Sequence, residues 1–169
     1  MREGFLYFTN LRLTFEPIVS KLLREDHILS ERLRDLQNAL EISKEAFIKS
    51  NTLVFCESCA ERGAKCCGEG LEWKLRPEEF FLNLCLFELK GKSLMLEGFL
   101  EGDCLFLGKS GCKLELAPLI CRNFFCSDLA EFIGLKGLIN IQNALENETR
   151  LSFELCQYVR HKLKGEKVL

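Results

Sequence analysis

The sequence has few of the residues that mark a linker, a membrane span or a histidine-based metal site. Its 169 residues include only three prolines and two histidines, and the net charge is -2. So few prolines argue against a long disordered linker, and a nearly neutral chain predicts no general attraction to nucleic acid or anionic membranes. No apolar run approaches the roughly 20 residues of a membrane span, and Met1–Phe5 lacks the apolar core of a secretory signal. We therefore expect a cytoplasmic protein with no nucleic-acid partner and no membrane partner.

Cysteine, in contrast, is abundant, with ten residues in the chain. The densest stretch, Cys56–Cys67, combines a C-x-x-C pair with the vicinal pair Cys66-Cys67. Because cytosolic thiols are kept reduced, clustered cysteines in such a protein bind metal more often than they form disulfides. Eight of the ten are predicted metal ligands: Cys56, Cys59, Cys66, Cys67, Cys104, Cys112, Cys121 and Cys126.

Thiolates gathered this densely repel one another, and a soft metal ion or an iron–sulfur cluster neutralises them while bonding several sulfurs at once. Eight thiolates make two tetrahedral sets of four, which suits two zinc ions or two clusters, and one cluster with spare thiols also fits. Adjacent residues usually point their side chains apart, so Cys66 and Cys67 are not expected to share one zinc ion. They serve two neighbouring sites or bridge within a polynuclear one.

The other two cysteines and the two histidines are not predicted to bind metal. Cys85 and Cys156 lie within apolar helical segments and are predicted to be small buried hydrophobic residues. His27 and His161 are far from the cysteines in sequence and are predicted to be surface residues. Arg122, next to Cys121, is predicted to donate hydrogen bonds to the sulfurs or to a loop carbonyl.

Apolar periodicity predicts a mainly α fold, with helices around a cysteine-rich metal knuckle and one short β-hairpin. Residues 1–16 are expected to form a short extended or irregular apolar arm, followed by a helix over 17–50 that breaks near Asp26-His27. This helix carries an apolar heptad seam, Leu22–Phe47. We favour packing of the seam within the chain, because it lasts under four heptads; the alternative is a protein partner.

Turn and cap signals predict the elements that follow. A second helix should run from Arg76-Pro77 to Gly91, and a last one over 129–163, capped by Ser127-Asp128 and interrupted near Gly134 and Gly137. Between them, short strands are predicted at 94–96, 104–107 and 112–116, with a turn over 108–111 that makes a hairpin of the last two. We expect residues 1–51 (arm and helix) and 52–169 (cysteine-cluster metal-binding domain) to form one compact unit.

The cysteine pattern resembles that of a known family. C-x2-C-x6-C-C, then C-L-F-L with Gly-Cys after a short turn, then P-L-I-C-R-N-F-F-C, is similar to the YkgJ-type zinc- or iron-chelating cysteine-cluster family, whose domain has a counterpart in flagellin lysine N-methylases. The resemblance covers about residues 56–126. It implies that the same eight cysteines bind the metal, and it also marks Pro118 and Arg122. The chain departs from the pattern at Ala117, where arginine is usual, and in the longer spacing before Cys66.

These observations predict a metal-binding protein that holds zinc or iron, or an iron–sulfur cluster, through the eight cysteines. One alternative, implied by the methylase resemblance, is a cluster-dependent methyl-transfer or redox enzyme. The sequence lacks a glycine-rich loop after a strand that would indicate a nucleotide or S-adenosylmethionine pocket. Another alternative is a zinc-stabilised interaction module that binds a protein through the Leu22–Phe47 helix.

Overall fold

The computed structural model describes residues 3–63, 66–96, 101–108, 111–166 and 168, and the fold is mainly α, as predicted. In chain order the elements are α1 (Glu3–Glu25), α2 (His27–Lys49), α3 (Thr52–Glu61), the 3-10 helix η1 (Leu71–Lys74), α4 (Pro77–Leu89), β1 (Leu107–Gly108), β2 (Gly111–Cys112), α5 (Leu119–Arg122) and α6 (Ser127–Gly165). The two strands pair antiparallel, with Leu107 opposite Cys112. Among the described helices, none has both the length and the apolar character needed to span a membrane.

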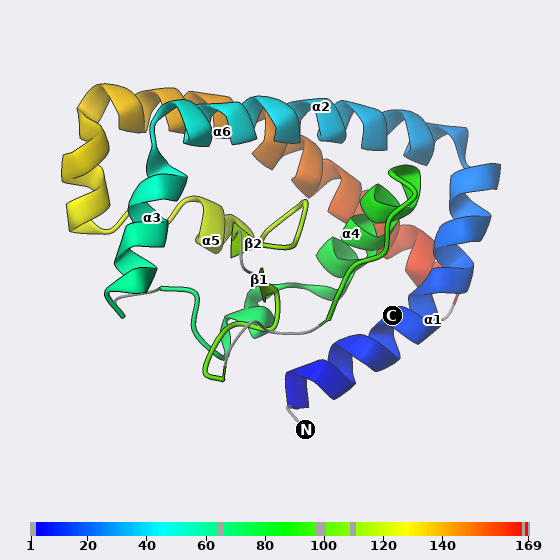
Figure 1. Cartoon of the computed structure of the whole chain (residues 1–169). Helices are drawn as coiled ribbons and strands as arrows, with labels where there is room; N and C mark the ends of the chain where they lie inside the picture. Colours follow the sequence, from blue (N-terminus) through cyan, green and yellow to red (C-terminus); the bar gives the residue numbers. More distant parts are fainter. Residues whose placement is uncertain (1–2, 64–65, 97–100, 109–110, 167, 169) are drawn as a thin grey trace.

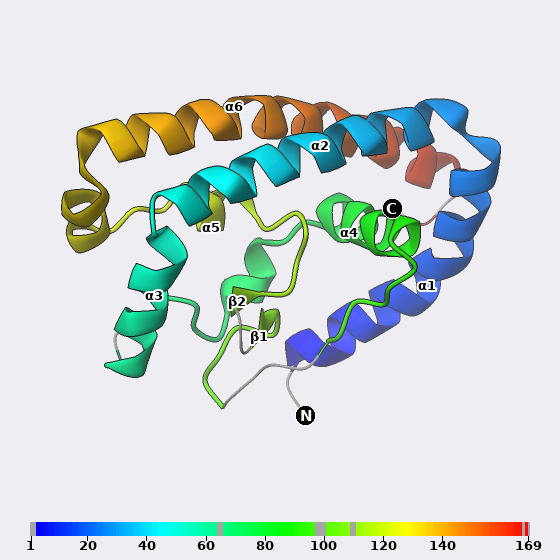
Figure 2. The ribbon, with the colours of Figure 1, turned by 45° about the horizontal axis from the view of Figure 1, so that its top comes forward.

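Four long helices build the frame. Figures 1 and 2 show α2 and α6 side by side, with α1 descending from one end of α2 and α3 from the other. Helix α4 lies in the angle between α1 and α6 and packs against both. It begins after Arg76 as predicted, and nine consecutive residues, 78–86, are buried. A single core cluster contains side chains from all four helices.

Residues 3–16 do not form the predicted extended or irregular arm, and residues 1–2 lie outside the described residues. Helix α1 begins at Glu3 and continues through Pro17. A proline inside a helix removes one backbone hydrogen bond and costs about 3 kcal/mol. Phe8 and Phe15 are both fully buried, with rings 5.1 and 5.3 Å from those of Phe80 and Phe81 on α4. Burying a phenylalanine contributes about 1.5–3 kcal/mol. The free energy gained by burying two such rings offsets the cost of the proline. Packing against α4 therefore keeps this segment helical.

The break predicted near Asp26-His27 is confirmed, because α1 ends at Glu25 and α2 begins at His27. The seam packs within the chain, as favoured: Leu29, Leu33 and Leu36 are fully buried against the other helices. These three side chains therefore lie in the core and not on the surface of the helix.

Helix α6 bends sharply near its start, as Figure 1 shows. The bend is at Gly134, where φ is 66° and ψ is 169°, a conformation that glycine adopts without the strain of a Cβ. The predicted interruption is thus confirmed at Gly134, whereas Gly137 is helical. The bend turns Ser127–Ile133 away from the axis of the rest of α6.

The corner between α1 and α2 is fixed by Asp26. Its carboxylate caps α2 by accepting from Leu29 N at 3.0 Å, and it accepts from Tyr158 Oη at 2.8 and 3.0 Å. Lys162 Nζ, also on α6, lies 2.8 Å from the same carboxylate. Partial burial acts to raise the pKa of Asp26, but the bonds from Lys162, Leu29 and Tyr158 outweigh it and lower the pKa to about 2. The carboxylate therefore joins the corner to α6.

The seam makes a direct prediction about stability. Leu36→Ala leaves a cavity in the core and should lower the free energy of unfolding by about 2–5 kcal/mol. Ile42→Ala, on the same helix but 58% exposed, should change it by less than about 0.5 kcal/mol. Urea unfolding of both variants measures the difference; equal losses would contradict the packing described.

The corner makes a prediction about pH. The native pKa of Asp26 lies below its ordinary value of 3.8, so its stabilisation is present above that pH and is lost as pH falls toward about 2. Asp26→Asn should therefore cost about 1–2 kcal/mol near neutral pH and much less near pH 2. Unfolding at both pH values, with the exposed Asp35→Asn as control, measures this. A cost independent of pH would show that the carboxylate charge is not what holds the corner.

Candidate metal centre

The eight predicted ligands come from short segments on one side of the α2–α6 pair. Figures 1 and 2 show α3, α5 and the β1–β2 hairpin gathered there. Cys56 and Cys59 are on α3, Cys112 on β2, Cys121 on α5, and the other four lie in the loops between elements or at their ends. All eight are exposed or half-buried. Their thiols can therefore be reached from solvent.

Cys56 and Cys59, which were assigned to the metal knuckle, lie on α3, a helix that the sequence did not predict. The turn comes later, at Gly63, where φ is 80°. The segment stays helical because Phe55 packs on Phe132 of α6, with ring centroids 4.8 Å apart. Residues three apart share a helix face, so both thiols lie on one side of α3. The guanidinium of Arg62 donates to Cys59 Sγ at 3.5 Å.

Cys67, Cys104 and Cys112 meet at the hairpin. Cys104 N donates to Cys67 O at 3.0 Å, and Leu107 N donates to Cys104 O at 2.9 Å. Leu107 in turn pairs with Cys112. The predicted hairpin is confirmed but is shorter than expected, with two residues in each strand. Its turn at 109–110 lies outside the described residues.

The strand predicted at 94–96 is not present. Leu94 and Leu96 are buried in the core, but Leu94 O accepts from Arg12 Nη1 at 3.0 Å. A side chain of α1 thus takes the backbone hydrogen bond that a neighbouring strand would have made.

Cys126 is the N-cap of α6, and its Sγ accepts from Leu129 N at 3.4 Å. The predicted cap, Ser127-Asp128, is one residue too late because the sulfur does the capping. Five residues earlier, Cys121 lies on α5. Between them, the ring of Phe125 stacks on Phe47 of α2, with centroids 6.4 Å apart. This contact holds the segment between the two cysteines against the frame.

Cys85 and Cys156 differ from the other eight. Both are buried in the core cluster, Cys85 at 0% and Cys156 at 1% exposure. The prediction that they are small hydrophobic residues of the core is confirmed. His27 and His161 are exposed on α2 and α6, as predicted. No disulfide joins any of the ten cysteines in the structure.

The thiols influence one another electrostatically. Loss of solvent around the thiol, with smaller contributions from the negative charges of neighbouring groups, raises the pKa of Cys104 to about 11 and that of Cys112 to about 12. Cys112 as a whole residue is exposed, whereas protein atoms surround its thiol and cause the desolvation. Desolvation, followed by the charges of other cysteines, also raises the pKa of Cys56 and Cys121. Without a cation, these four thiols stay protonated near neutral pH.

Arg122 fixes the position of Cys121. Its Nε donates to Ala117 O at 2.6 Å, which confirms the prediction of a loop carbonyl as acceptor. Its guanidinium forms an ion pair with Glu148 of α6, whose side chain is 1% exposed. Burial lowers the pKa of Arg122 to about 10, so the guanidinium remains charged at neutral pH. The pair anchors α5 to the frame.

Sequence reasoning missed Glu148. Six of the nine buried positions along α6 (Ile141, Leu145, Glu148, Ser152, Leu155 and Val159) are spaced alternately four and three residues apart. A carboxylate at one of these core-facing positions requires a buried cationic partner. A glutamate among these core-facing positions of α6 was the signal in the sequence that could have revealed a buried ion pair. It does not identify Arg122 as the partner.

The donor set fits a soft metal ion, since it consists of reachable thiols within electrostatic range of one another. Among the residues that the structure describes, no three or more cysteine, histidine or acidic side chains are arranged closely enough to hold an ion. The thiols are therefore gathered in one region without forming a closed coordination site.

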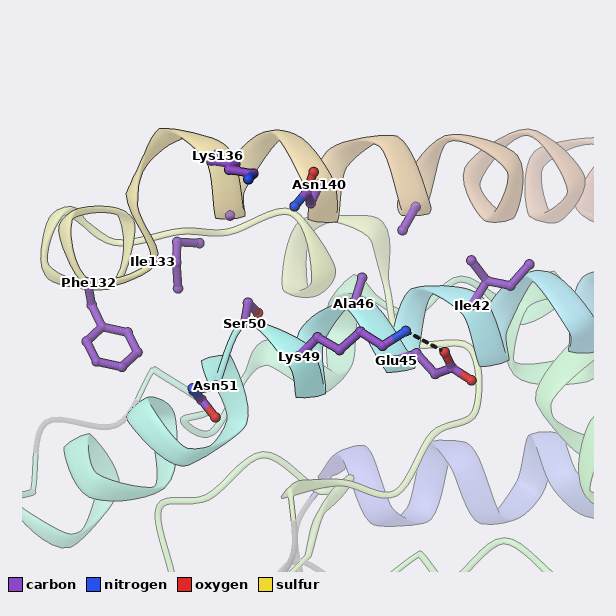
Figure 3. Close-up of a pocket in the computed structure, with 12 residues that line it drawn as sticks. Ile42, Glu45, Ala46, Lys49, Ser50, Asn51, Phe132, Ile133, Lys136 and Asn140 are labelled. Carbon is purple, nitrogen blue, oxygen red and sulfur yellow. Dashed lines mark hydrogen bonds and ion pairs between the residues drawn. The ribbon is translucent and has the colours of Figure 1, made fainter.

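A separate hollow of about 640 Å³ lies between the end of α2 and the first half of α6. Figure 3 shows Phe132, Lys136 and Asn140 on one of its walls, and the Lys49–Glu45 ion pair within α2. Its described lining residues include no cysteine, so this hollow is not part of the thiol region.

Comparison with models of protein families, with curated proteins and with solved structures finds no match to the chain. The similarity to the YkgJ-type family stays a prediction from the cysteine pattern.

The Arg122–Glu148 pair gives a prediction. Glu148→Ala leaves a buried guanidinium without its partner and should lower the free energy of unfolding by about 3–5 kcal/mol. Glu146→Ala removes an exposed carboxylate from the same helix and should change it by less than about 0.5 kcal/mol. Chemical denaturation of both variants tests this. Similar small losses in the two would mean that the pair does not anchor α5.

Proposed function

We propose that this chain is a metal-binding protein that holds zinc or iron, or an iron–sulfur cluster, through the eight accessible cysteines. One observation carries the proposal. The eight thiols outside the core come from segments far apart in sequence and gather on one side of the frame, whereas the other two cysteines are core residues. A protein that needed cysteine only for packing would bury it.

The chemistry of the thiols supports a cation as ligand. The raised pKa values of Cys56, Cys104, Cys112 and Cys121 mean that folding alone opposes the thiolate form of these four residues. A metal ion takes the place of the protons, so binding should release protons and weaken as pH falls. When bound, zinc would supply a structural cross-link, and iron would add electron transfer. Arg62 and Arg122 offset part of the excess negative charge that an all-sulfur site leaves.

The short lengths of α5, β1 and β2 suggest that a bound metal would stabilise this part of the structure. Helix α5 has four residues and each strand has two, too short to be stable by their own hydrogen bonds. Metal–sulfur bonds would join these short elements to one another. With no disulfide in the structure, metal–sulfur bonds are the cross-link that the sequence can supply.

Location and partners follow from the same chemistry. Free thiols in this number suit a reducing compartment, so we place the protein in the cytoplasm. The apolar seam that a protein partner would have used is buried, which favours the metal-binding function over an interaction module. The likeness to the YkgJ-type family adds support from the same residues.

The test compares cysteines of the two kinds. The ligand variants are Cys59→Ser, Cys67→Ser, Cys112→Ser and Cys121→Ser. Each replaces a soft thiolate with a poor donor, so each should lower the metal content per chain and destabilise the domain. Cys85→Ala and Cys156→Ala remove a buried sulfur, should cost about 1 kcal/mol, and should keep the metal.

All six variants are purified identically without oxygen or chelator, and metal per chain is measured in each. Loss of metal from a core variant as complete as from Cys121→Ser would contradict the division between ligand and core cysteines. Unchanged metal in all four ligand variants would overturn the proposed function.

A further inference from the structure

We propose that the hollow between the end of α2 and the first half of α6 binds a small carboxylate with an apolar body. Its volume of about 640 Å³ is typical of small-molecule sites, which enclose about 300–1,000 Å³. The inference concerns a second site, apart from the cysteines, and goes beyond the proposed metal-binding function. It holds whether or not the chain binds metal.

The hollow exists because α2 and α6 meet through small residues and then separate. Ser43 Oγ on α2 donates to Ala144 O on α6 at 3.0 Å, so the two helices approach closely there. Next to this contact the hollow is lined by Ala46 on α2 and Gly137 on α6, whose side chains are too small to fill it. The bend at Gly134 then carries the start of α6 away from its axis. Packed helices normally interdigitate without voids, so this gap is open to a ligand.

Apolar side chains stand at both ends of the hollow and are only partly covered by the protein. Figure 3 shows Phe132 and Ile133 at one end and Ile42 at the other. Phe132 is 53% exposed and Ile42 is 58% exposed. A ligand with an aromatic or aliphatic body, placed between them, would remove part of this surface from water, which favours binding.

Hydrogen-bond donors are available beside these apolar side chains. Lys136, Asn140 and Asn51 line the hollow, and within the described part of the chain their side chains make no hydrogen bond or ion pair. Lys136 and Asn140 are four residues apart on α6 and therefore share one face of the helix. An ammonium group and an amide N–H both donate, and a carboxylate accepts from both. The polar lining therefore fits a carboxylate head.

The charges around the hollow favour an anion. Among its described lining residues, three are charged: Glu45, Lys49 and Lys136. Lys49 Nζ lies 3.0 Å from a carboxylate oxygen of Glu45, so these two charges offset each other. Lys136 leaves one positive charge, which matches a ligand with one carboxylate. Hydrogen bonds to an ionised group are stronger than those between neutral groups, so the head should add to the affinity of the apolar body.

Decanoate and naphthoate are the probes for the test, and naphthylmethanol is the neutral counterpart of the second. Ligand-observed NMR titrations of the full chain give the dissociation constants. We expect saturable binding of at least one carboxylate. Naphthylmethanol should bind about tenfold more weakly than naphthoate, because a hydroxyl gains no charge-assisted hydrogen bond from Lys136.

Three variants locate the site. Lys136→Gln should weaken carboxylate binding about tenfold and leave the binding of naphthylmethanol unchanged. Lys164→Gln removes an exposed lysine of the same helix outside the hollow and should change neither. Ala46→Trp fills the hollow and should abolish binding of all three probes. Circular dichroism checks that each variant is folded. Should Ala46→Trp fail to fold, the comparison of the two lysine variants decides alone.

Two kinds of result would overturn this proposal. The first is no saturable binding of either carboxylate, or equal affinities in Lys136→Gln and Lys164→Gln. The second is a wild type that sediments as a dimer and becomes a monomer in Ala46→Trp, since a second copy would then fill the hollow. Metal per chain is measured in the same samples. Carboxylate binding without metal contradicts only the metal-binding function, and metal without carboxylate binding contradicts only the site in the hollow.

Discussion

The electrostatic cost of ionising closely gathered thiols is the constraint on which the thiol region depends. Thiols from α3, the hairpin, α5 and the start of α6 act on one another electrostatically. The frame of α1, α2, α4 and α6 is stable for ordinary reasons, since it buries rings and leucines in a single core. The hairpin segment shares in this stability, because Leu105, Phe106, Leu114 and Leu116 belong to the same core. A cation that bonds several thiolates would overcome the repulsion between them and would cross-link the segments that carry them.

The frame prepares the thiol region through a few contacts. Phe47 and Phe55 hold the segments next to Cys126 and Cys56 by packing on Phe125 and Phe132. The buried pair Arg122–Glu148 ties α5 to α6. A buried ion pair is costly to form and more costly to leave half made, so it fixes position better than it adds stability. Positioning is what a thiol cluster requires, because sulfurs held near one another lose less conformational freedom when a metal binds them.

The sequence predicts those parts of the structure that depend on residues close together in the chain, and it misses contacts between residues far apart. Local patterns predicted α4, the buried seam of α2, the break at Asp26-His27, the hairpin and the core positions of Cys85 and Cys156. Helix α1 was missed because Pro17 was taken as a helix start, although Phe8, Phe15 and Leu22, seven residues apart, mark one buried face. Helix α3 was missed because its cysteines were taken to require a turn. Contacts such as Asp26 with Tyr158, 132 residues apart, leave no trace in local sequence, and neither does the pairing of Glu148 with Arg122.

The central claim is that the accessible thiols hold metal, and the metal content of the wild-type protein tests it most directly. The protein is purified without oxygen and without chelator; metal per chain is then measured together with visible absorption and the number of thiols that react with a thiol reagent. The account predicts a whole number of zinc or iron ions, with visible absorption only in the iron–sulfur case. It also predicts that reactive thiols rise toward eight only after the metal is removed. A folded, metal-free chain with eight reactive thiols from the outset would contradict it.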